Sequence, residues 1–318
     1  MLSSVNNKRK RRSPVGACKE LLRQVKKHPV LYFMLIPCLA YFVIFKYVPM
    51  QGFLIAFKNF RATKGIWGSD WAGTRHFELL FRDAAFRSAF QNTVIISVSK
   101  IIVNFVFSFL LALLLNEFRS QKIRGTVQTI IYLPHFLTWV VIGSLLNNMF
   151  SLSNGVVNEI IKWFGGKPIN LTTNPANFRG VLVITEAIKE GGWNSIIYMA
   201  AISSIDTQMY EAACIDGANR WKQMLYITIP SLLPTATIML ILSLSHVLSA
   251  GFDQVYVLYN PAVMETGDII DTLIYRKALM NVNYSYGAAA DLLKGLISAA
   301  LILLTNKIVK LLGGEGMF

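Results

Sequence analysis

Ionisable and aromatic side chains inside apolar stretches mark where this sequence could bind a polar solute. Such side chains are costly in a membrane unless they pair or line a cavity. Aromatic faces beside hydrogen-bonding groups suit sugars in particular. For each residue a structural role is also open, because intramembrane charges pair and tyrosines near an interface belong to the aromatic belt. The candidates for a substrate path are Lys100, Trp193, Asn194, His246, Asp253, Gln254, Tyr256, Tyr284 and Asp291.

The charge of the solute would affect how three basic residues inside the apolar stretches are interpreted. Lys100, Lys189 and His246 gain importance if the solute is anionic, since a cation inside a span needs a partner. A metal site at His246 is not expected, because no second ligand stands three or four residues away.

Catalytic motifs are not found in the sequence. Neither a Gly-x-Ser-x-Gly elbow nor a His-Glu-x-x-His pair is present. The run Gly165-Gly166-Lys167-Pro168 lacks the spacing and the hydroxyl of a phosphate-binding loop. We therefore expect neither an enzyme nor a cofactor in this chain, and any driving energy must come from a partner.

Composition indicates the elements that position these side chains. The chain has 318 residues, of which 54% are hydrophobic and 15% charged, and its mean hydropathy is +0.47. This is too apolar for one soluble core, so we expect an all-α polytopic membrane protein. A bilayer core of about 30 Å needs roughly 20 apolar residues per helix. On that scale six spans are expected, at about 30–48, 92–116, 127–150, 179–203, 231–251 and 287–311.

Charge sets the expected orientation. The net charge is +14, and basic residues concentrate in the tail 1–29, directly before the first apolar run. The positive-inside rule places this tail in the cytoplasm, and six crossings return the carboxyl end to the same side. The first run lacks a small-residue cleavage site, so it is expected to remain as a helix. The cysteines Cys18, Cys38 and Cys214 lie in different kinds of segment, and no disulfide is expected.

A polar connector, residues 206–230, separates the fourth and fifth predicted spans and would face the cytoplasm. Asp206 is a suitable N-cap for a helix over about 207–215, and Gly217 can adopt the positive φ that ends it. A second helix is expected over about 219–228, with Pro230 at the start of the next span. The small side chains of Ala212 and Ala213 would let a partner backbone approach closely. A simple amphipathic surface hairpin is the alternative.

At this connector the sequence resembles a known family. The run Glu211-Ala212-Ala213, followed by Gly217 and by Ile227-x-Ile229-Pro230, is similar to the EAA loop of ABC importer permeases. Asp216-Gly217-Ala218 and Ile227-Thr228-Ile229-Pro230 most resemble the carbohydrate-importer branch, the family of the maltose permease subunits. Ile229 stands where that family often has leucine. Weaker matches to the lipoprotein-associated oligosaccharide permeases of the LplB group are Tyr47-Val48-Pro49-Met50, Tyr132-Leu133-Pro134 and Asn260-Pro261.

The resemblance implies a type I ABC importer permease domain over 30–318, in a bacterial cytoplasmic membrane, that imports an oligosaccharide, including acidic ones from plant or algal polysaccharides. It implies two partner ATPase subunits that bind ATP and Mg²⁺, an extracytoplasmic solute-binding protein and a second homologous permease. That branch commonly pairs two different permeases, although the sequence does not exclude two copies. The residues implied to couple to the ATPase are Glu211, Ala212, Ala213, Asp216, Gly217, Ala218, Arg220, Ile227, Ile229 and Pro230.

Two other functional classes of membrane protein are alternatives. An ion-coupled secondary transporter would need no ATPase and should show internal repeats or broken helices, and no repeat is visible. An integral membrane enzyme should show a catalytic cluster. Copurification with an ATPase would favour the importer, whereas ion-driven uptake by this chain alone would favour the secondary transporter.

Overall fold

The computed structural model describes residues 27–311, which form two compact units divided after Leu54. Nearly all of the predicted tail 1–29 lies outside the described residues. α2 (Pro29–Phe42) continues through a π-turn, η1 (Val43–Tyr47), into η2 (Val48–Phe57), of which the residues up to Leu54 belong to the first unit. Pro29–Phe57 together form one candidate span of 29 residues, which confirms the first predicted span and extends it.

Three spans of the second unit are long single helical runs. They are α5 (Ala84–Asn116), α16 (Tyr284–Leu311), and a run in which α11 (Arg220–Gln223) and η4 (Met224–Thr228) lead into α12 (Ile229–Ser245). Their length and hydropathy are sufficient to cross a bilayer. The predicted spans 92–116 and 287–311 are confirmed. The predicted span 231–251 is too long, because the helix ends before residue 246.

The predicted span over 127–150 is not one continuous helix. The chain here forms α6 (Gln121–Tyr132), η3 (Leu133–Phe136) and α7 (Trp139–Met149), and the two halves meet at an angle of 101°. Pro134 has no N–H to continue the helical ladder, and Thr138 caps α7 by accepting a hydrogen bond from the Val141 N–H (3.4 Å).

The predicted fourth span lies on α9 (Pro175–Ser203), a helix of 29 residues. It is long enough to cross a bilayer but carries Glu186, Lys189 and Glu190 near its middle, so composition alone does not identify it as a span. The small residues of α9 allow neighbouring helices to pack closely against it. A Cβ added at Gly192 would meet the backbone carbonyl oxygen of Ile131, so only glycine lets α6 come this near.

Short elements connect the long helices. At one end of the spans a two-residue antiparallel ladder pairs Lys58 with Trp71 and Asn59 with Asp70. At the opposite end lies α10 (Thr207–Ile215), in the connector. The others are β1 (Lys58–Asn59), α3 (Gly65–Gly68), β2 (Asp70–Trp71), α4 (Arg75–Arg82), α8 (Val156–Trp163), α13 (Phe252–Leu258), η5 (Pro261–Val263), α14 (Met264–Gly267), α15 (Ile270–Ile274) and η6 (Tyr275–Met280).

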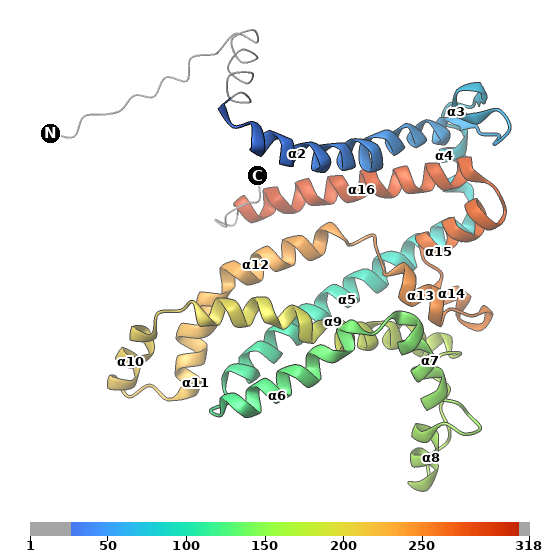
Figure 1. Cartoon of the computed structure of the whole chain (residues 1–318). Helices are drawn as coiled ribbons and strands as arrows, with labels where there is room; N and C mark the ends of the chain where they lie inside the picture. Colours follow the sequence, from blue (N-terminus) through green and yellow to red (C-terminus); the bar gives the residue numbers. More distant parts are fainter. Residues whose placement is uncertain (1–26, 312–318) are drawn as a thin grey trace. The chain divides into compact units, whose positions relative to one another are not determined.

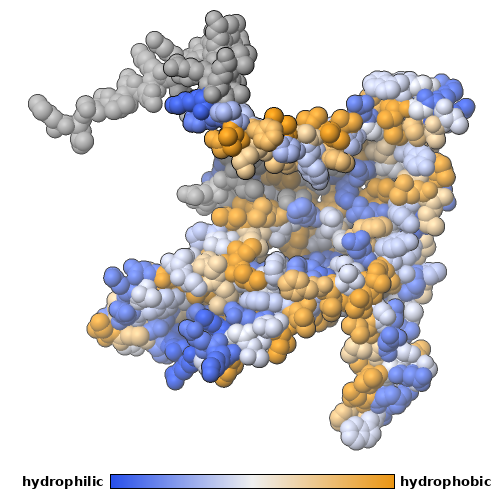
Figure 2. All heavy atoms as spheres, viewed as in Figure 1, coloured by the Kyte–Doolittle hydropathy of each residue, from blue (hydrophilic) through white to orange (hydrophobic). Residues whose placement is uncertain are grey.

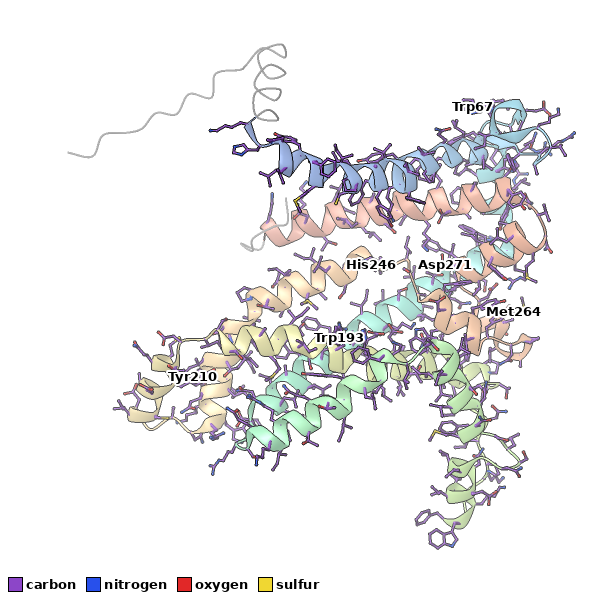
Figure 3. The ribbon with its side chains drawn as sticks, viewed as in Figure 1. Trp67, Trp193, Tyr210, His246, Met264 and Asp271 are labelled. Atoms are coloured by element: carbon purple, nitrogen blue, oxygen red, sulfur yellow. The ribbon has the colours of Figure 1, made fainter. Side chains whose placement is uncertain are left out.

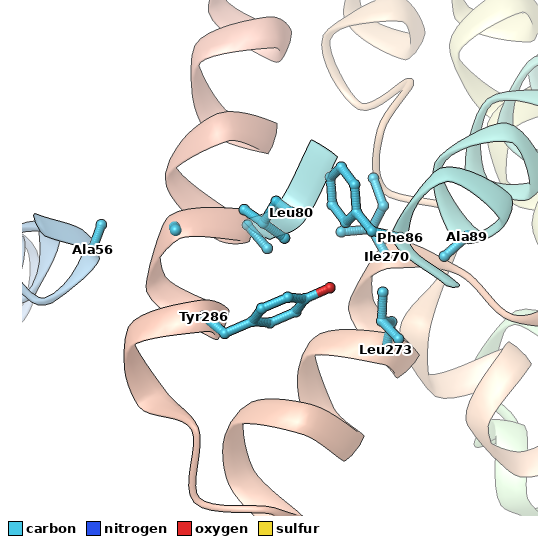
Figure 4. Packing of buried hydrophobic residues seen from close by; sticks show 9 residues of the cluster. Ala56, Leu80, Phe86, Ala89, Ile270, Leu273 and Tyr286 are labelled. Atoms are coloured by element: carbon cyan, nitrogen blue, oxygen red, sulfur yellow. The ribbon is translucent and has the colours of Figure 1, made fainter. Parts of the chain in front are cut away.

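The helices of the second unit pack around α5 and α9, which share the most extensive helix contact in the described chain (Figure 1). Towards the connector, Leu115 of α5 and Tyr198 of α9 are buried with Leu232 of α12. At the other end of α5, Phe86 packs with Leu273 of α15 and other members of a separate cluster (Figure 4). Hydrophilic side chains gather on the surface where α10, α11 and the start of α6 lie (Figure 2).

Candidate functional site

A polar cavity of about 250 Å³ lies between α5, α9 and α12, and we call it the central cavity. On α5, Ser97, Asn104 and Ser108 are spaced so that they share one helix face. The residues that follow the end of α12 complete the wall of the central cavity. The polar and charged lining residues are Ser97, Lys100, Asn104, Ser108, Glu186, Asn194, Tyr198, Ser243, His246 and Ser249.

Hydrogen bonds orient the polar groups of the central cavity. Asn104 Oδ1 accepts from Ser108 Oγ (3.0 Å) and from Asn194 Nδ2 (3.3 Å), which links α5 to α9. The hydroxyl of Ser97 is buried and has no hydrogen-bond partner among the described residues. A buried hydroxyl without a partner is unfavourable, so the cavity offers an unused polar group to a solute or to water.

The structure brings some of the predicted substrate-path residues together. Lys100, Asn194 and His246 all line the central cavity. Gln254 lies next to it and is fully buried, with its amide donating to the Leu182 carbonyl oxygen (2.8 Å) and to Thr185 Oγ1 (2.8 Å).

The remaining candidates lie elsewhere. Asp253 and Asp291 are exposed on α13 and α16. Tyr256 stacks on Phe252, with ring centroids 5.3 Å apart, and Tyr284 meets Phe60 edge to face. The structure therefore does not place these four residues in the central cavity.

Trp193 belongs to an aromatic cluster beside the bend between α6 and α7 (Figure 3). Its ring stacks on His135 with centroids 4.4 Å apart and planes 3° apart, and Phe136 meets it edge to face. His135 Nδ1 is 2.7 Å from Glu190 Oε2. Lys189 donates to the His135 carbonyl oxygen (2.7 Å) and to Glu190 Oε1 (2.9 Å). Trp193 remains 41% exposed, so an aromatic surface with polar neighbours is open here.

Sequence reasoning missed His135 and Phe136 as neighbours of Trp193. They are 57 to 58 positions away in the sequence and approach only because the chain bends after Pro134. The signal in the sequence is a proline followed by a histidine and an aromatic residue, within a stretch whose apolar character predicts a continuous span.

The connector has the predicted local structure. Asp206 caps α10 by accepting from the Gln208 N–H (2.9 Å). Gly217, at φ +75°, ends it. The Ala218 N–H donates to the Ala213 carbonyl oxygen (2.8 Å), and the Gly217 N–H donates to the Cys214 carbonyl oxygen (3.1 Å). This pair of bonds is a Schellman motif, which needs a residue with positive φ at the glycine position.

Pro230 stands in the first turn of α12, as predicted, although the helical backbone is continuous from α11 through η4 into α12. The ladder widens to a π-turn just before the proline, and the Ile229 N–H bonds to the Met224 carbonyl oxygen. This turn carries the chain past a residue that has no N–H to donate.

The connector presents an open surface of mixed character. Large apolar side chains are exposed, among them Ile215 (88%), Trp221 (70%) and Tyr226 (78%). Exposed apolar side chains in such a cluster are typical of a protein contact. Glu211, Ala212, Asp216, Gly217, Arg220 and Pro230 are exposed, whereas Ala213, Ala218 and Ile229 are partly buried and Ile227 is buried.

Internal bonds hold the connector to the spans. Tyr210 bonds through its hydroxyl to Thr228 Oγ1 (2.8 Å), and Arg220 pairs with Glu117 at the end of α5 (3.3 Å). α10 is therefore bonded to the η4 turn that leads into α12, and α11 is bonded to the residue that caps α5.

A second charged cluster lies where α4 meets α5, at the end of the spans far from the connector (Figure 1). The Asp83 carboxylate pairs with Lys277 and accepts from the Tyr286 hydroxyl (2.5 Å). Burial opposes its charge, but the hydrogen bonds from Lys277, Tyr286 and the Ala85 N–H prevail and hold the pKa of Asp83 below its ordinary value.

Comparison with known proteins identifies the family. Residues 104–314 match the family model described as "Binding-protein-dependent transport system inner membrane component". The chain is 39% identical over 300 residues to the polygalacturonan/rhamnogalacturonan transport system permease protein YteP of Bacillus subtilis (strain 168), with 94% of each chain covered. It is 36% identical over 313 residues to Protein LplB of the same organism, with 98% of each covered.

Two solved structures are also similar. One is a bacterial ABC transporter involved in the import of the acidic polysaccharide alginate; the TM-score is 0.85 at 37% identity, over 92% of this chain and 98% of that one. The other is a bacterial alginate ABC transporter in complex with an alginate pentasaccharide-bound periplasmic protein; the TM-score is 0.86 at 36% identity, over 93% of this chain and 99% of that one.

The chain therefore belongs to the family of binding-protein-dependent transport system inner membrane components. The predicted type I permease fold and the predicted carbohydrate branch of the ABC importer permeases are confirmed. The protein is a multi-pass membrane transport subunit and not an enzyme.

Proposed function

We propose that this chain imports an oligosaccharide, as one of two permease subunits served by two ATPase subunits and an extracytoplasmic solute-binding protein. The observation that carries the proposal is the connector: its helix α10 is capped and exposed, Tyr210 of α10 is bonded to Thr228 at the end of η4, and Arg220 of α11 pairs with Glu117 at the end of α5. Such a surface can bind another protein, and a conformational change of that protein can then displace the connector. We place both termini and the connector in the cytoplasm of a bacterium, with the basic tail as the anchor of that orientation.

Glu211 and the Ala212 face are proposed to enter a groove of the ATPase. Glu211 makes no ion pair within the described chain, so its carboxylate is free to meet a basic group of the partner. ATP and Mg²⁺ would bind to the ATPase subunits. Movement of α10 would then be transmitted through the Tyr210 and Arg220 contacts to the helices that line the central cavity.

The solute is proposed to pass the central cavity and the aromatic cluster. Trp193 supplies an exposed aromatic face, and Asn104, Asn194 and Ser97 supply hydrogen-bonding groups in the cavity. This combination suits a sugar ring, which presents both apolar faces and hydroxyl groups.

An acidic sugar is the class we favour. The relatives named for polygalacturonan or rhamnogalacturonan and for alginate belong to systems for polysaccharides that contain acidic sugars. His246 is the one basic side chain lining the cavity for which no ion pair is found in the described range. The imidazole N–H of His246 can donate a hydrogen bond to a carboxylate of such a sugar.

Reconstituted uptake tests this proposal. Proteoliposomes with the permease pair, the ATPase and the binding protein should take up oligogalacturonate or oligoalginate only when ATP is supplied on the ATPase side. Uptake of neutral oligosaccharides alone, unaffected by His246→Ala, would contradict the acidic class. Uptake without ATP would contradict the importer.

A further inference from the structure

The helix of the fifth span ends where it borders the central cavity. Between α12 and α13, residues 246–251 are not helical, and we call them the interrupted segment. The Ser249 N–H donates to the His246 carbonyl oxygen (2.8 Å), and Gly251 has φ +85°. Backbone groups released from a helix inside a membrane protein need other partners, because lipid cannot supply them.

One of these partners is the Lys100 ammonium of α5. It donates to the Ala250 carbonyl oxygen (2.6 Å), to Gln254 Oε1, and to Glu186 Oε2 of α9 (3.4 Å). An ammonium has three N–H donors, so acceptors within the chain use all of them. The Lys100 side chain is only 8% exposed, and no donor is left for a solute.

The acceptors are themselves fixed. The Gln254 amide nitrogen donates to Leu182 and Thr185 of α9, which turns its carbonyl oxygen towards Lys100. At Gly251 an added Cβ would lie 3.0 Å from Lys100 Nζ, so the backbone approaches the ammonium as closely as glycine allows. Unwound backbone carbonyl groups, like that of Ala250, are also used by transporters to coordinate a coupling cation.

We propose that Lys100 is a positioning residue, a tethered cation that occupies this site and holds the interrupted segment against α5 and α9. It sets where His246 and Ser249 face the central cavity and does not bind the solute itself. The inference rests on the proposed passage of solute through this cavity.

Accessibility of Ser249 tests the position of the segment. In a cysteine-free background (Cys18→Ser, Cys38→Ser, Cys214→Ser), Ser249→Cys is labelled with N-ethylmaleimide in the purified full chain. Adding Lys100→Ala should raise the labelling rate about tenfold, the factor that corresponds to about 1.4 kcal/mol of lost restraint. Ethylammonium should return the rate towards the starting value, because it can fill the vacated cation site. The matched control is Lys294→Ala, which removes an ammonium paired with Asp271 away from the cavity and should leave the rate unchanged.

Lys100→Ala leaves the Glu186 carboxylate without its partner and can impair folding. The double variant Lys100→Ala with Glu186→Gln removes both charges and should show the same increase in labelling. In the uptake assay, Lys100→Ala should lower kcat with little change in KM, and ethylammonium should restore part of it. Unchanged labelling combined with a raised KM would overturn the assignment and make Lys100 a solute ligand.

Labelling needs no ATPase and no binding protein. Failure of the wild-type permease to take up any oligosaccharide would therefore contradict the proposed function, whereas the labelling result alone decides the role of Lys100.

Discussion

The connector and the central cavity are built in opposite ways. The connector is a continuous stretch whose helix, cap and turn are set by neighbouring residues, and several of its large apolar side chains are exposed. The cavity is assembled from three helices, with bonded partners as far apart as Lys100 and Gln254. The residues proposed to contact the ATPase are therefore close together in the sequence. The residues that line the proposed solute path come from distant parts of the sequence. Four predictions test this contrast, from the largest expected effect to the smallest.

Gly217→Pro should abolish ATP-dependent uptake. Proline cannot adopt φ +75° and removes the N–H that bonds to the Cys214 carbonyl oxygen. The turn that ends α10 is then disrupted, and the orientation of α10 relative to α11 changes. Gly165 is the matched control, because it has φ +79° at the end of α8 and donates to the Lys162 carbonyl oxygen in the same way. Gly165→Pro should retain uptake. Equal losses in both variants would mean that the connector turn has no special role.

Glu211→Lys should reduce ATP-dependent uptake strongly while leaving insertion and folding intact. Reversing an interfacial charge leaves the partner charge unpaired, at a cost of about 2–5 kcal/mol. Glu159→Lys on α8 is the control, because it also reverses an exposed acid. Uptake and ATPase stimulation are measured for both variants. Similar rates for Glu211→Lys and the wild type would remove Glu211 from the coupling surface.

Trp193→Ala should raise the KM for uptake about tenfold with little change in kcat, since an aromatic contact is worth about 1 kcal/mol or somewhat more. Tyr256→Ala serves as the comparison, because Tyr256 is similarly exposed but lies outside the central cavity and the aromatic cluster. A larger KM effect at Tyr256 than at Trp193 would move the proposed path towards α13.

Asp83→Asn should lower the Tm by a few degrees at pH 7 and by much less at pH 3. The folded-state pKa of Asp83 lies below its unfolded value, so its contribution to stability is present above about pH 4 and is lost as pH falls through the folded pKa. Thermal unfolding of the detergent-solubilised protein at both pH values measures this. Uptake by the variant should remain near that of the wild type. A Tm difference that grows on acidification would contradict the assignment.

Local signals explain what could be predicted from the sequence. Asp206 and Gly217 act within a few positions of themselves, so the limits of α10 followed directly. The apolar runs located the long helices for the same reason. Hydropathy could not show the bend after Pro134 or the interrupted segment, because both lie in stretches that remain apolar.

The central cavity was only partly predictable. Lys100, Asn194 and His246 stood out as polar residues in apolar runs, but their grouping depends on how α5, α9 and α12 pack. One partner of Lys100 could not be identified from the sequence, since Ala250 contributes only a backbone carbonyl group.

Copurification of the ATPase tests the central claim most directly. The permease is coexpressed with its ATPase, purified through a tag on the permease, and compared with Glu211→Lys and Glu159→Lys. We expect the ATPase to be retained by the wild type and by Glu159→Lys, and to be lost from Glu211→Lys while that variant remains folded. Equal retention by all three, or uptake by the permease alone driven by an ion gradient, would contradict it.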